Sequence, residues 1–143
     1  MDIGLSASCS AHVYGSYDED TVYTYNQGAN GTAATMNIAG NGLKKITLAG
    51  ISVNNPCPSR GRNGTGSSSM TASYCLTITG DGRTLFNSSS WSAGQTIDIT
   101  GVNSLSYNLR ITSYYPSYGG DDFRNQDYYQ TYGVSSAMTL SNY

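Results

Sequence analysis

The sequence has 143 residues, a net charge of −2 and only 11% charged residues, which suits a single domain with a buried core. The few basic residues are scattered along an acidic chain, and this argues against nucleic acid, which favours a clustered positive surface. All apolar runs are short, so we expect no helix that inserts into a membrane.

The composition favours β-structure. Helix-forming residues at helical spacing are almost absent, whereas Gly (17), Tyr (13), Ser, Thr and Asn are abundant. We predict one all-β domain over residues 1–143, an antiparallel β-sandwich or jelly roll of about eight or nine strands with little or no helix.

The first part of the chain alternates between apolar and polar residues in short segments. Residues 1–17 are expected to form a first strand or an extended arm that lies on a neighbouring subunit, and residues 21–25 a second strand. Residues 26–32 have the composition of a loop, and alternation returns over residues 34–38.

The next segment, Leu43 to Val53, is strand-like but changes its apolar parity on the way. Ile46 and Leu48 share one parity, and Ile51 and Val53 share the other. This predicts a bulge or bend near Ala49-Gly50. Residues 54–69 then lose all apolar patterning, which predicts a long loop.

The segment from Tyr74 to Thr112 has the clearest pattern, three strands joined by short polar turns. Gly80-Asp81-Gly82 supplies residues that tolerate the positive φ of a tight hairpin. Because side chains alternate across a strand, one set is expected to form the core. That set comprises Tyr74, Leu76, Ile78, Ile97, Ile99, Leu105, Tyr107, Leu109 and Ile111.

Within this segment, a strand followed by GDGRTLFNSSS, then GQTIDITGVNSLSYNLRIT, and a closing strand resembles the carboxyl half of galactose-binding-like jelly-roll modules. Such modules occur in carbohydrate-binding proteins and in phage appendages. The resemblance implies a β-sandwich with binding residues on variable loops, so it assigns no site residue by position.

Residues 114–132 contain six tyrosines, more than a small core accommodates with every hydroxyl satisfied. Tyrosine is enriched at protein interfaces and sugar-stacking platforms. We therefore predict a binding surface here, helped by residues 54–69; the alternative is that half of the tyrosines cap the ends of the sandwich and that Trp91 plugs the core. The predicted binding residues are Tyr114, Tyr115, Tyr118, Asp121, Asp122, Arg124, Tyr128, Tyr129, Tyr132 and Trp91.

The three cysteines have the wrong spacing for a zinc site. Cys57 and Cys75 bracket the unpatterned loop, so they are the candidates for a disulfide. Cys9 would then be buried and free, or linked to another chain. The alternative is three reduced thiols in a β core.

Nothing in the sequence indicates catalysis. His12 is the single histidine and has no Ser–Asp context, and the acidic clusters at residues 18–20 and 121–127 lie in polar segments where carboxyl groups keep ordinary pKa values. We expect no cofactor and no enzyme activity. Calcium is the ion that such loop oxygens would suit, although neither cluster has EF-hand spacing.

Two functions fit these features. The first is a structural or adhesive protein of an exposed assembly, such as a phage head-decoration, tail or fibre protein, which contacts other subunits or a host surface. The second is a secreted carbohydrate-binding module that recognises cell-surface glycans. The N-terminal MDIGLSASCS lacks the features of a signal peptide, so we expect a protein on a virion surface, or an extracellular one whose signal was removed.

Overall fold

The computed structural model describes residues 1–15, 21–24, 29–54, 67–119 and 127–143, and across these ranges the chain forms strands and no helix. The all-β prediction is confirmed. The strands are β1 (Asp2–Gly15), β2 (Thr21–Thr24), β3 (Ala29–Asn37), β4 (Lys45–Leu48), β5 (Ser52–Asn54), β6 (Ser67–Gly80), β7 (Arg83–Ser88), β8 (Thr96–Asp98), β9 (Ser104–Gly119) and β10 (Asp127–Ser141).

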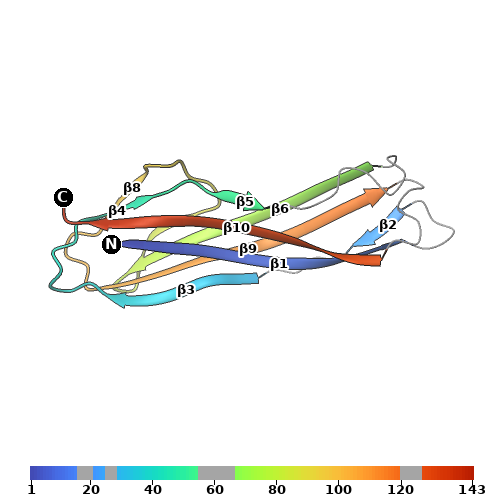
Figure 1. Cartoon of the computed structure of the whole chain (residues 1–143). Coiled ribbons are helices and arrows are strands. Elements are labelled where there is room, and N and C mark those ends of the chain that lie inside the picture. Colours follow the sequence, from blue (N-terminus) through green and yellow to red (C-terminus); the bar gives the residue numbers. More distant parts are fainter. Residues whose placement is uncertain (16–20, 25–28, 55–66, 120–126) are drawn as a thin grey trace.

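All pairings between these strands are antiparallel, in the order β7-β6-β9-β2-β1-β10-β4-β8, with β3 added to β9 and β5 to β10. The short strand β2 joins two halves, because it pairs with β9 on one side and with β1 on the other. Buried side chains of both halves form one core. The strands therefore make a sandwich, with β7-β6-β9-β3 in one layer and β1-β10-β4/β5-β8 in the other (Figure 1).

Two long strand pairs run the length of the molecule. β1 pairs with β10 from Asp2 to Tyr14, and β6 pairs with β9 from Ser67 to Gly80. Residues 2–15 of the predicted first strand therefore form a strand of the chain's own sheet, which pairs with β10 along its length and with β2 only at Val13–Gly15. Both termini lie at one end, and the end of β9 and the start of β10 lie at the other (Figure 1).

The predicted core is confirmed with one adjustment. Eight of the nine residues are buried, and Leu76, Ile78, Ile99, Leu105 and Leu109 have no exposed surface. Tyr74 is half-buried and packs against the core. Burial of these side chains is the main favourable term that holds the two layers together.

The predicted hairpin turn joins β6 to β7. Gly80 pairs with Arg83, so Asp81 and Gly82 form a two-residue loop with φ of 51° and 81°. Positive φ at both positions is the type I′ geometry that suits the twist of a hairpin. The Asp81 carboxylate also accepts hydrogen bonds from the backbone N–H groups of Asn103 and Ser104, at 3.1 Å and 2.9 Å. The turn thus fixes the start of β9.

The predicted bend near Ala49-Gly50 is also confirmed, because β4 ends at Leu48 and β5 begins at Ser52. The bend divides one predicted strand into two. Residues 26–32, predicted as a loop, include the start of β3 at Ala29, and the predicted loop 54–69 ends with β6 already begun at Ser67.

Candidate functional site

The segment predicted as the binding surface is largely strand. β9 continues to Gly119, and β10 already begins at Asp127. Tyr115 and Tyr118 pair with Thr71 and Ser68 on β6, whereas Tyr128 and Tyr129 pair with Val13 and His12 on β1. The two Tyr-bearing strand ends lie at the same end of the sandwich, away from the termini (Figure 1). The side chains of these four tyrosines are outside the described residues, and so are Asp121, Asp122 and Arg124 entirely.

Tyr114 and Tyr132 belong to the core, not to an exposed surface. Their exposed fractions are 0% and 3%, and their rings stack at a centroid distance of 5.1 Å and an interplanar angle of 20°. A bulge causes the burial of Tyr114. Ser113 pairs with Ser73 but Ile111 pairs with Tyr74, so Thr112 is an extra residue that shifts the inward parity of β9.

Burial raises the pKa of Tyr132, and the nearby Tyr74 and Cys9 raise it further. The folded protein therefore favours the neutral phenol, and this contribution to stability is present below the unfolded pKa of about 10. It is lost as the pH rises from there through the folded pKa. We predict that the free energy of unfolding falls more steeply above about pH 10 in the wild type than in Tyr132→Phe, which cannot ionise. Parallel pH profiles of the two proteins would contradict this.

The Trp91 ring packs against other side chains of the domain and is not a free stacking surface. It is half-buried against the core, and makes edge contacts with Tyr74 and Phe86 at centroid distances of 5.7 Å and 6.1 Å. Its Nε1–H donates to the Ala49 carbonyl at 2.8 Å. The indole thus ties the segment after β7 to the bend between β4 and β5, as in the predicted alternative of a core plug.

The cysteines show no link among the described residues. Cys75 is a half-buried free thiol whose Sγ donates to Asn87 Oδ1 at 3.0 Å. Cys57, the other half of the predicted bridge, lies outside the described residues. Cys9 is free and half-buried, and burial raises the pKa of its thiol.

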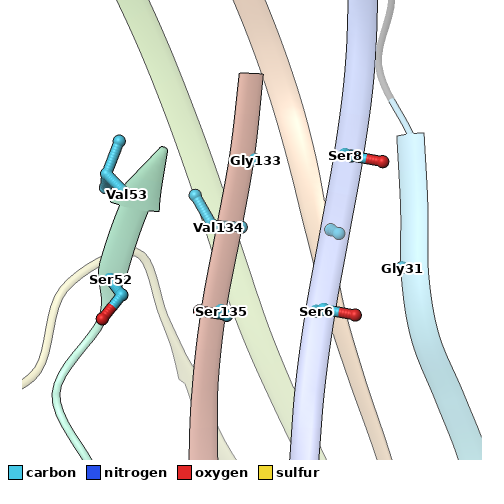
Figure 2. A pocket seen from close by; sticks show the side chains of 9 residues that line it. Ser6, Ser8, Gly31, Ser52, Val53, Gly133, Val134 and Ser135 are labelled. Atoms are coloured by element: carbon cyan, nitrogen blue, oxygen red, sulfur yellow. The ribbon is translucent and has the colours of Figure 1, made fainter. Parts of the chain in front are cut away.

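A pocket of about 430 Å³ crosses β5, β10, β1 and the start of β3 (Figure 2). Figure 2 shows Ser6 and Ser8 directed from β1 toward the side of Gly31. The lining contains serines, glycines, alanine and valine but no acid, base or thiol, so it offers hydroxyl groups without a group to activate them. The pocket is lined by Ser6, Ala7, Ser8, Gly31, Ser52, Val53, Gly133, Val134 and Ser135.

A second polar constellation, which sequence reasoning missed, lies on the outer face of β9, β6 and β7. Arg110 is half-buried, and its Nη1 donates to Thr77 Oγ1 at 3.2 Å and to Asn108 Oδ1 at 3.4 Å. Thr77 in turn donates to Asn87 Oδ1 at 3.4 Å, the same oxygen that accepts from Cys75. A chain of neutral partners therefore holds the guanidinium.

Beside Arg110 is a second pocket of about 470 Å³. Two rows of side chains cross it. Thr35, Ser106 and Thr79 are paired across β3, β9 and β6, and so are Ala33, Asn108 and Thr77 in the next row. The alternation of core residues along β9 indicates that the residues between them face outward. It does not indicate which residues of β3 and β6 lie beside them, because that depends on the register of the strand pairs.

The carboxylates of Asp2, Asp81 and Asp98 each accept hydrogen bonds from within the chain. Backbone and side-chain hydrogen bonds from Thr100 lower the pKa of Asp98, and Asp81 binds backbone N–H groups. Among the side chains that the structure describes, no three His, Cys, Asp or Glu residues gather as a metal site would require. In the same part of the chain, no helix has the length and apolarity needed to cross a membrane.

No protein-family model, curated protein or solved structure matches the chain. The strand pairings define the class of the fold as an antiparallel all-β sandwich. Fold alone does not assign a function, so function is argued from the surfaces of this chain.

Proposed function

We propose that the protein is a non-enzymatic structural or adhesive component of an exposed assembly, most simply a phage head-decoration, tail or fibre protein at the virion surface. Its tyrosine-bearing strand ends would contact neighbouring subunits or a host surface. A galactose-binding-like relationship is part of this proposal, because the antiparallel sandwich is compatible with it.

The observation that carries the proposal is the placement of the tyrosines. β9 and β10 continue beyond the stacked pair Tyr114 and Tyr132, and bring Tyr115, Tyr118, Tyr128 and Tyr129 to one end of the molecule. Both termini lie at the opposite end (Figure 1). Strands that are paired along their length make a rigid support, on which recognition residues are held with little entropy to lose.

Tyrosine suits this role physically. Its ring offers a large contact area, its hydroxyl finds a partner at a wet rim, and only two side-chain torsions are frozen on binding. The low charge of the chain also favours contact, because few ions must be desolvated when surfaces meet.

The test is Tyr128→Ala/Tyr129→Ala, with Tyr143→Ala as the matched control. Tyr143 is 85% exposed at the terminal end. We expect the wild type and the control to self-associate in sedimentation equilibrium, and the double variant to be monomeric with an unchanged thermal midpoint. Loss of folding in the double variant would place these tyrosines in the core and overturn the proposal.

A wild-type protein that is monomeric at all concentrations would also count against an assembly component. The same protein binding neutral or acidic oligosaccharides on a glycan array would then favour the carbohydrate-binding module. In that case the tyrosines would stack on sugar rings instead of on a neighbouring subunit.

A further inference from the structure

We propose that the outer face of β3, β9 and β6 binds a carboxylate-bearing sugar, with the Arg110 guanidinium holding the carboxylate and the adjoining pocket holding the ring. This inference goes beyond the proposed function, because it concerns a different face and does not require the tyrosine-bearing end to bind anything.

Within the described part of the chain, the Arg110 side chain has no acidic partner. Among the described residues its side chain bonds only to the neutral oxygens of Thr77 and Asn108, and no carboxylate pairs with it. A half-buried guanidinium loses part of its hydration, and a neutral oxygen compensates for this less well than a charged acceptor does. The position therefore favours an anion from outside the chain.

Neither of the two bonds to described residues uses the edge of the guanidinium that suits a carboxylate best. Both are made by Nη1, so the Nε–H and the Nη2–H groups keep their donors. These two groups point the same way along one edge, and a carboxylate binds such an edge through two parallel hydrogen bonds.

The guanidinium is also fixed before the ligand arrives. Thr77 Oγ1 accepts from Arg110 and donates to Asn87, so the hydroxyl has one orientation, and Asn87 is in turn held by Cys75. A long side chain that is already ordered loses little entropy on binding.

The pocket beside Arg110 has the chemistry for a sugar ring. Its 470 Å³ lies within the roughly 300–1,000 Å³ typical of small-ligand sites. Thr35, Ser106 and Thr79 present hydroxyls across three strands, and cross-strand neighbours about 5 Å apart match the width of one ring. The small residue Ala33, which pairs with Asn108 across the strands, also lines this pocket.

The alternative source of a carboxylate is an acidic peptide. The carboxylate of such a peptide would bind the guanidinium but would not use the rows of Thr and Ser hydroxyls in the pocket. Each of these hydroxyls both donates and accepts hydrogen bonds, and so does each hydroxyl of a sugar. Thr35 and Ser106 illustrate this, since their hydroxyls already bond to one another at 2.9 Å. The sugar is therefore the favoured ligand.

The experiment titrates the full chain with trigalacturonate, with neutral maltotriose and with triglutamate, and follows backbone amide shifts by NMR. We expect trigalacturonate to shift residues 77, 79, 106, 108 and 110, and to bind at least about tenfold more tightly than either control. If maltotriose bound as tightly as trigalacturonate, the carboxylate would not contribute to binding. If triglutamate bound as tightly, the pocket would not recognise the sugar ring. Either result would contradict the proposal. Shifts confined to other surfaces, or none, would overturn the proposal.

Arg110→Gln should weaken the affinity for trigalacturonate at least about tenfold, and Arg110→Lys several-fold because Lys keeps the charge but not the two-pronged edge. Arg83→Gln is the matched control, since Arg83 is an exposed arginine of the same sheet, on β7. Unchanged affinity in Arg110→Gln, or an equal loss in Arg83→Gln, would contradict the assignment. The shift map of the wild type decides the question even where a variant is unstable.

Discussion

Replacing Leu109 with Ala is expected to lower the free energy of unfolding by about 2–5 kcal/mol, the cost of lost burial plus an unfilled cavity. Leu109 has no exposed surface and lies in the middle of β9, which pairs with β6 on one side and β3 on the other. A strand held on both sides collapses poorly around a cavity. Urea denaturation monitored by tryptophan fluorescence would measure the change.

The control for this substitution is Val53→Ala on β5. Val53 is 48% exposed, so its truncation should cost well under 1 kcal/mol. Equal midpoints for Leu109→Ala and the wild type would show that β9 is peripheral, against the core described above.

Replacing Gly31 with Ala is expected to destabilise the protein by about 1–3 kcal/mol or more through overpacking. An added Cβ would lie 2.0 Å from the Ser6 carbonyl oxygen and 2.5 Å from Ala7 Cβ. Backbone cannot yield as a flexible side chain does, so β3 would have to move away from β1. This contact closes one side of the sandwich, where the register of β3 on β9 also shifts.

Gly4→Ala is the matched control, because a Cβ at Gly4 meets nothing within 4 Å. It should leave the unfolding midpoint nearly unchanged or raise it slightly, since Ala restricts the unfolded chain more than Gly does. Equal stability of the two variants would contradict the close approach of β3 to β1.

The all-β class, the core residues, the bend and the hairpin could be predicted because each depends on a short stretch of sequence. Alternation identified the core residues of β6, β8 and β9, the parity change in 43–53 identified the bend, and Asp81-Gly82 identified a hairpin. What alternation could not reveal is a bulge. One extra residue at Thr112 reverses the parity of β9 and turns Tyr114, predicted at the surface, into a core residue.

The candidate sites were less predictable because they depend on pairing between distant segments. The composition of the tyrosine-rich segment predicts a binding surface and shows no strand pattern, yet β9 and β10 continue through much of this segment, because β6 and β1 provide partners along their whole length. Arg110 reads in the sequence as an outward residue of a core strand. Its partner Thr77 is 33 residues away and becomes a neighbour only in the register of β6 with β9.

Hydrogen–deuterium exchange, compared between dilute and concentrated protein, tests the central claim most directly. If the tyrosine-bearing strand ends form the contact between subunits, backbone amides of residues 115, 117–119 and 127–131 should gain protection at high concentration. Amides at the terminal end, such as those of residues 39–44, should exchange at the same rate in both samples. Protection confined to the terminal end, or unchanged exchange throughout, would contradict an assembly through the tyrosines.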